Sequence, residues 1–95
     1  MLCPTPEGRL CDTQGRPYFL WDCDVTLAEF RAHLAAPDDA RRAYWLAKMM
    51  RQGKPDDAIL IGGVEEMRRL WSSLARSLGR VRGFWEWYLA WTDDR

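Results

Sequence analysis

The sequence predicts an all-α domain, a compact bundle of about five short helices with a flexible N-terminal arm. Residues 40–51 combine strong helix formers with apolar side chains on two sides, as a helix covered on both sides requires. Apolar side chains recur at helical spacing in several other segments, with glycine or proline between them. Because no segment alternates apolar and polar residues as a half-buried strand does, strands are not expected.

The length, 95 residues, is that of one domain, and 47% of the residues are hydrophobic, so the chain can bury a core. Six tryptophans are a heavy aromatic load for this length. Most of them are expected to pack inside. Because Trp, Tyr and Arg are enriched at protein interfaces, a partner-binding surface made by about two or three of these rings is the alternative.

Residues 1–17 are expected to form a flexible arm, and residues 18–95 a single helical domain. Prolines and glycines are scattered among polar residues in the arm, which offers little apolar surface to offset the entropy of ordering. An arm that docks onto a partner is the alternative. After it, Tyr18, Phe19 and Trp21 are expected to pack in extended form across the helical body.

The first helix is predicted over residues 26–35. Thr26 and Glu29 have the spacing of a capping box, in which each side chain hydrogen-bonds the backbone N–H of the other. The side chains expected on its core face are Leu27, Phe30 and Leu34.

The central helix is predicted over residues 38–52. Pro37 and the acids that follow it favour a helix start, because carboxylates complement the helix dipole there, and Gly53 ends the helix. Its core face carries Ala40, Ala43, Leu46, Ala47 and Met50. Trp45 and Met49 form a second apolar strip almost opposite.

Two more helices are predicted after Gly53. Pro55 and the two aspartates after it repeat the start signal, so a short helix is expected over residues 55–61, ended by Gly62 and Gly63. The next helix, residues 63–78, has the most regular apolar spacing in the chain. Its expected core side chains are Val64, Met67, Trp71, Leu74, Ala75 and Leu78.

The last helix is predicted over residues 80–91, and residues 92–95 are expected to fray. The side chains expected on its inner side are Val81, Phe84, Tyr88 and Trp91, with Trp85 and Leu89 widening that side. Trp87 points elsewhere on the helical wheel, so the core does not explain it.

The net charge is zero, so the sequence gives no overall attraction to nucleic acid or to an acidic membrane. The charges are nevertheless segregated: residues 22–39 hold five acids and Arg31, whereas residues 41–54 hold five bases and no acid. Such a pattern indicates either elements that meet face to face or a surface with one acidic and one basic side.

No enzymatic activity, metal or cofactor is expected. The single histidine, His33, has no nucleophile motif to serve, and Gly62 and Gly63 lack the spacing and the lysine of a phosphate-binding loop. Asp22 and Asp24 form a D-x-D pair, but nothing supplies further metal ligands, so they are expected to cap a helix or to pair with arginines.

The three cysteines, Cys3, Cys11 and Cys23, are odd in number and lack the close pairs of a structural zinc site, so they are expected to be reduced thiols. The sequence has no apolar run long enough for a membrane span and no signal-peptide pattern. A cytoplasmic location and no membrane partner are therefore expected.

Residues 55–78 resemble a helix-turn-helix, whose second helix would present polar and basic side chains to DNA. The candidate DNA-binding residues are Arg68, Arg69, Ser72, Arg76, Arg80 and Arg82. Glu65 and Glu66 stand at the end that would enter a groove, where carboxylates repel phosphate. A small DNA-binding regulator is therefore an alternative function, which would also allow autoregulation.

At Phe19-Leu-Trp21-Asp22-Cys-Asp24, again at Arg51–Ala58 and at Phe84-Trp85, the sequence resembles a small uncharacterised bacterial family. The resemblance covers residues 18–91. Genes of this family precede nucleotidyltransferase-like toxins of the abortive-infection kind, which implies that the protein is an antitoxin, a stoichiometric inhibitor of such a toxin. The resemblance brings no catalytic residues with it.

The sequence therefore predicts a protein-binding module. Its acidic segment would block a basic, phosphate-binding cleft, anchored by the aromatic rings that the core explains least. The candidate partner-binding residues are Trp21, Asp22, Asp24, Glu29 and Trp87. A third alternative is a homo-oligomeric structural protein, such as a homodimer in which spare aromatic rings pack across a twofold axis.

Overall fold

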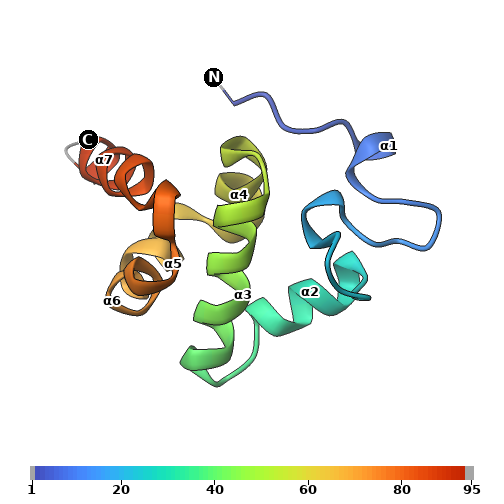
Figure 1. Ribbon diagram of the computed structural model, residues 1–95, viewed down its shortest axis with the longest axis horizontal. Helices are drawn as coiled ribbons and strands as arrows, with labels where there is room; N and C mark the ends of the chain where they lie inside the picture. Colours follow the sequence, from blue (N-terminus) through green and yellow to red (C-terminus); the bar gives the residue numbers. More distant parts are fainter. Residues whose placement is uncertain (1, 94–95) are drawn as a thin grey trace.

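The helix α3 (Asp39–Gln52) runs through the middle of the molecule, with the other helices around it, as the computed structural model of residues 2–93 shows (Figure 1). The Asp38 carboxylate caps its start by accepting the Ala40 N–H at 3.0 Å, and the Gly53 N–H closes its end on the Met49 carbonyl. Ala47 and Met49 are both buried although they lie on nearly opposite sides of α3. The predicted central helix with two covered sides is thus confirmed, although Ala40 is exposed.

The helix α2 (Leu27–Leu34) packs against α3 and begins with the predicted capping box. The Glu29 N–H donates to Thr26 Oγ1 at 3.2 Å, and the Thr26 N–H donates to the Glu29 carboxylate at 2.9 Å. Phe30 carries α2 into the core, where its ring meets Phe19 and Trp45 edge-on at centroid distances of 5.2 and 6.2 Å.

The helix α4 (Pro55–Gly62) follows α3 after a tight turn and ends where the two helices touch closely. A Cβ at Gly62 would lie 2.6 Å from Leu46 Cδ1, so a side chain at this position would have to displace the buried Leu46 side chain. Gly63 follows with a φ of 86°, a backbone conformation that favours glycine. The predicted Gly-Gly stop is confirmed.

The predicted single helix over 63–78 is wrong, because the chain forms α5 (Val64–Arg69), a break at Leu70, α6 (Trp71–Leu74) and a 3₁₀ turn η2 (Ala75–Ser77). Leu70 has φ −99° and ψ 10°, outside the helical region. Leu70, Leu74 and Leu78 all stay buried across the break.

The helix α7 (Arg82–Asp93), preceded by a 3₁₀ turn η3 (Gly79–Val81), is present but rotated from the predicted orientation. Trp85 and Leu89 are buried, whereas Phe84 and Trp91, which were predicted to face inward, are exposed. Trp85 Nε1 donates to the Met50 carbonyl at 3.1 Å, and Met50 lies in the last turn of α3, where carbonyls lack helical partners. This hydrogen bond favours Trp85 as the buried ring.

Residues 2–17 differ from the expected flexible arm, because they contain a short helix α1 (Glu7–Leu10) and hydrogen-bond to the start of α4. The buried carboxylate of Asp57 accepts the Thr5 N–H at 2.7 Å, Thr5 Oγ1 at 2.6 Å and the Tyr18 hydroxyl at 2.6 Å. Asp56 accepts the Cys3 N–H at 2.7 Å. These hydrogen bonds hold residues 2–17 against α4, although the segment has little apolar surface to bury.

The segment after it also differs from the prediction of extended packing. Tyr18–Leu20 form a 3₁₀ turn, η1, which buries Phe19 and Leu20 against α3. The following residue, Trp21, projects away from the core instead of packing across the body.

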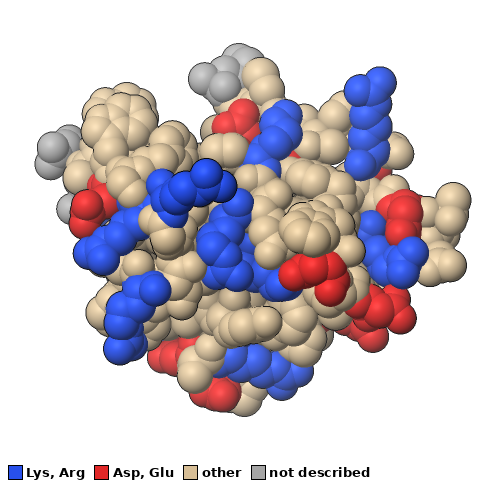
Figure 2. Space-filling view, viewed as in Figure 1, with Lys and Arg blue, Asp and Glu red and all other residues tan. Residues whose placement is uncertain are grey.

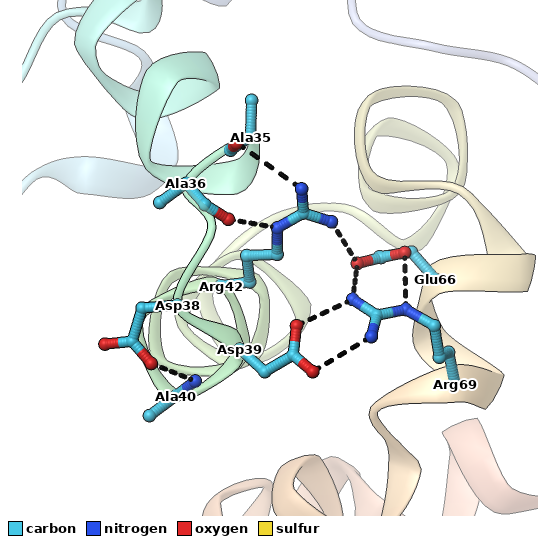
Figure 3. Close-up of polar contacts among 8 residues, drawn as sticks. All are labelled: Ala35, Ala36, Asp38, Asp39, Ala40, Arg42, Glu66 and Arg69. Carbon is cyan, nitrogen blue, oxygen red and sulfur yellow. Dashed lines mark hydrogen bonds and ion pairs between the residues drawn. The ribbon is translucent and has the colours of Figure 1, made fainter.

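Four charged side chains tie the start of α3 to α5 and to the end of α2 (Figure 3). Glu66 accepts from Arg42 at 3.0 Å and from Arg69 at 2.5 Å, and Arg69 also donates two hydrogen bonds of 3.0 Å to Asp39. Arg42 reaches the carbonyls of Ala35 and Ala36 as well. The guanidinium of Arg69 holds the pKa of Asp39 and of Glu66 below their ordinary values.

The all-α fold class is confirmed: residues 2–93 contain one isolated bridge, between Cys11 and Pro17, and no strand. Within this part of the chain, no helix has the length and apolar character needed to cross a membrane.

Candidate protein-binding surface

Four aromatic rings, which we call the aromatic face, lie together on the outer side of α7. They are Phe84, Trp87, Tyr88 and Trp91. Phe84 stacks on Tyr88 at a centroid distance of 6.1 Å, and Trp87 stacks on Trp91 at 6.0 Å. The spacing i, i+3, i+4 and i+7 places the four rings on one stripe of the helix.

Much of this face is accessible to solvent. Phe84, Trp87 and Trp91 are 41%, 59% and 52% exposed, and Tyr88 is partly buried. Apolar surface left in water forgoes roughly 25 cal/mol per Å² that burial would supply. Scattered exposed apolar residues are ordinary, but a contiguous exposed patch is characteristic of an interaction site.

The surroundings of the aromatic face leave room for another protein to approach. Gly83 and Ala90, both exposed and both small, lie on α7 beside it. A groove of about 270 Å³ borders the helix, lined by Arg68, Trp71, Glu86, Leu89 and Ala90. A protruding side chain of a partner could enter this groove while the rings make the flat contact.

A second exposed surface lies where η1 leads into α2. Trp21 is 75% exposed there, the largest exposure among the exposed large hydrophobic side chains, and the side chain of Asp24 is 90% exposed. Asp24 lies 3.4 Å from the guanidinium of Arg16. Trp21 and Asp24 are therefore presented to solvent, as expected of partner-binding residues.

The other acids of the predicted site are engaged within the fold. Asp22 accepts from Lys48 Nζ at 2.7 Å, and the hydrogen bond from Lys48 lowers the pKa of Asp22. Glu29 serves in the capping box, and its hydrogen bond from the Thr26 N–H lowers its pKa. The Asp22–Lys48 pair joins the acidic and basic segments of the sequence, which confirms the face-to-face interpretation at this point. It also compensates part of the negative charge of the acidic segment.

The predicted set of partner-binding residues is therefore split between two surfaces. α7, which carries Trp87, and the η1–α2 segment, which carries Trp21, lie on opposite sides of α3 (Figure 1). Sequence reasoning missed Phe84, Tyr88 and Trp91 as surface residues. The sequence does contain an indication of this exposure: five of the twelve residues of α7 are aromatic, which is more than the buried side of one helix can accommodate.

The candidate DNA-binding residues do not form one basic helix face, because the helix is interrupted at Leu70. Arg69 is paired with Asp39 and Glu66, and Arg68 is paired with Glu65 and donates to Thr92 at 2.6 Å. Ser72 is exposed, and Arg82 lies 3.8 Å from Glu86. Arg76 and Arg80 are exposed and make no ion pair with residues 2–93.

The space-filling view shows basic side chains over the α5–α7 side of the molecule, where they are more prominent than acidic ones (Figure 2). This distribution is the remaining feature that favours an anionic partner, since paired arginines such as Arg69 already have their charge compensated.

The groups that most often carry chemistry have structural contacts here. His33 Nδ1 accepts from Arg41 Nε at 2.9 Å, and its ring stacks on Trp45 at 4.4 Å. Burial raises the pKa of the Cys11 and Cys23 thiols, so neither is an activated thiolate. Residues 2–93 contain no group of three or more His, Cys, Asp or Glu side chains placed to hold a metal ion.

Burial works to raise the pKa of Asp57, but hydrogen bonds from Thr5 and Tyr18 outweigh it and hold this pKa below the ordinary value. Asp57 therefore stays ionised as an anchor for residues 2–17, and nothing at this position resembles a proton-transfer site. Comparison with known proteins adds no assignment, because the chain matches no protein-family model, curated protein or solved structure.

Proposed function

We propose that the protein is a binding module without a chemical step of its own, and that exposed tryptophans anchor it to another protein. One observation carries this proposal: Trp21, Trp87 and Trp91, three of the six tryptophans, are each more than half exposed. Tryptophan is the residue most enriched at the energetic centres of interfaces, where its large apolar ring is desolvated.

The resemblance of residues 18–91 to the toxin-neighbouring family supplies the class of partner. In this proposal the protein is a cytoplasmic antitoxin that neutralises a nucleotidyltransferase-type toxin by direct binding. Trp21 is the anchor in the toxin cleft, and Asp24, whose side chain is 90% exposed, contributes a carboxylate to a basic partner. Because Asp22 is already paired with Lys48, the contact depends more on the indole ring than on negative charge.

The test is binding to the product of the adjacent gene, measured by isothermal titration calorimetry with purified proteins. Trp21→Ala is expected to weaken binding at least tenfold, because truncation of an anchor costs more than about 1.4 kcal/mol. Leu60→Ala is the control, since Leu60 is a 55% exposed apolar residue on α4 and belongs neither to the aromatic face nor to the η1–α2 segment.

A second measurement uses growth of cells that express the neighbouring protein. The wild-type module and Leu60→Ala are expected to restore growth, and Trp21→Ala is not. If neither Trp21→Ala nor the double variant Trp87→Ala, Trp91→Ala affects binding or rescue, the exposed tryptophans are not the anchors and the proposal fails.

DNA binding is a second candidate, favoured by one observation: Arg76 and Arg80 are exposed and carry no compensating acid among residues 2–93. Binding to DNA through such residues releases counterions and weakens steeply as salt rises. The affinity of a complex anchored by tryptophan changes much less with salt concentration. Affinity for the gene's own promoter, measured at two salt concentrations, separates the two candidates.

A further inference from the structure

We propose that a second copy of this chain covers the aromatic face of α7, so that two α7 helices pair antiparallel across a twofold axis. This proposal rests on the proposed function, because it takes exposed tryptophans to be interface anchors. It adds an assignment of the two surfaces: the aromatic face serves self-association, and Trp21 is left for a different protein.

The first argument is the order of the rings along the helix. Positions 84, 87, 88 and 91 have spacings of three, one and three residues, and this order reads the same in reverse. In an antiparallel pair, Phe84 therefore lies opposite the partner subunit's Trp91, and Trp87 opposite the partner subunit's Tyr88. One surface patch is then complementary to itself, as a twofold interface requires.

The second argument is charge. Arg80 lies in η3, just before the helix, and Arg82 is the first residue of α7. A parallel pair would bring these like charges together, whereas an antiparallel pair places them at opposite ends of the two helices. The net charge of the whole chain is zero, so no overall repulsion separates two copies.

The third argument is area, and it also sets the expected strength. A fully covered large aromatic side chain buries roughly 150–250 Å², so four half-accessible rings supply about 400 Å² per copy. Two copies bury about 800 Å², roughly half of a standard interface. Contact with Gly83, Ala90 and the groove beside Trp71 adds to this area. A reversible dimer with a dissociation constant of about 1–100 µM is expected.

The pairing has a consequence for the rest of the molecule. Because the η1–α2 segment lies on the other side of α3 from α7, a dimer joined through α7 has its two η1–α2 segments on the sides of the α3 helices that are remote from the paired α7 helices (Figure 1). A partner protein could then be bound by each subunit without disrupting the dimer.

Sedimentation equilibrium of the isolated full-length chain tests this proposal, at protein concentrations from about 1 to about 300 µM. The wild-type weight-average mass is expected to rise from the monomer value toward twice that value. The double variant Trp87→Ala, Trp91→Ala is expected to dimerise at least tenfold more weakly. Trp21→Ala, which removes the most exposed indole from the other surface, is expected to dimerise like wild type.

Far-UV circular dichroism of all three proteins checks that the fold is retained, which is expected because the substituted rings are exposed. A wild-type chain that stays monomeric at the highest concentration overturns the proposal, and so does a dimer that the Trp87, Trp91 double variant leaves intact. If the chain is monomeric but Trp21→Ala still loses binding to the neighbouring gene product, self-association fails and the proposed function stands.

Discussion

Replacement of Asp57 by alanine is expected to lower the free energy of unfolding by about 3 kcal/mol. The Asp57 carboxylate is buried at the start of α4 and accepts three hydrogen bonds, two from Thr5 and one from Tyr18. A hydrogen bond to a charged group contributes about 1.5–3 kcal/mol, and the freed Thr5 and Tyr18 donors recover part of this from water. The remaining loss is a large share of the roughly 5–15 kcal/mol that holds a domain folded.

Asp56→Ala is the matched control. Asp56 is in the same first turn of α4, so both variants lose a similar favourable interaction with the helix dipole. Asp56 accepts one exposed hydrogen bond, from the Cys3 N–H, and its loss is expected to cost less than about 1 kcal/mol. The difference between the two variants isolates the buried anchor.

Urea denaturation followed by circular dichroism gives both free energies. Hydrogen exchange adds a local measurement: the Thr5 N–H is expected to lose its protection in Asp57→Ala and to keep it in Asp56→Ala. Equal effects of the two substitutions, or less than about 0.5 kcal/mol for Asp57→Ala, would refute the reasoning that a buried carboxylate docks residues 2–17.

Two further predictions concern charge. The folded-state pKa values of Asp57, Asp39 and Glu66 lie below their ordinary values of 3.8, 3.8 and 4.5, so the stability they contribute is complete above about pH 5 and is lost as the pH falls through the folded-state values. The melting temperature is expected to fall between about pH 5 and pH 2.5, and to fall less in Asp57→Ala; parallel curves for the two proteins would contradict this. Glu66→Ala, which removes the acceptor shared by Arg42 and Arg69, is expected to cost about 1–2 kcal/mol in urea denaturation. The Glu65 side chain is mostly exposed, so Glu65→Ala is expected to cost less than about 0.5 kcal/mol. Equal losses of unfolding free energy in Glu66→Ala and Glu65→Ala would show that the network of Glu66, Arg42 and Arg69 is not stabilising.

The parts of the fold that sequence predicted well are those fixed by neighbours in the chain. The capping box of Thr26 and Glu29 and the Asp38 cap depend on residues within three positions, so their spacing is enough to identify them. The two-sided burial of α3 follows from a periodic pattern that is visible without knowledge of any partner helix.

The parts that failed depend on contacts distant in sequence. Thr5 and Asp57 are 52 positions apart. The sequence of residues 1–17 alone therefore does not indicate that Thr5 hydrogen-bonds to a buried carboxylate on α4. The break at Leu70 likewise reflects packing in the core, which overrides a regular apolar spacing.

The orientation of α7 could not be read from its pattern for a related reason. With aromatic side chains on several sides, the helix offers two apolar faces of similar strength, Trp85 with Leu89 and Phe84 with Trp91. The Met50 carbonyl at the end of α3 favours the face with Trp85, because it gives the Trp85 indole a hydrogen-bond partner. With Trp85 and Leu89 buried, the face with Phe84 and Trp91 is exposed to solvent and forms the candidate interface.

The most direct test of the claim that the aromatic face is an interface is a set of ¹H–¹⁵N spectra of the six tryptophan indoles, recorded over a range of protein concentrations. The Trp87 and Trp91 signals are expected to shift as concentration rises, while the signals of Trp21, exposed on the other surface, and Trp85, buried against α3, stay in place. If the Trp87 and Trp91 signals do not move, or if the Trp21 signal moves with them, this face is not where two copies meet.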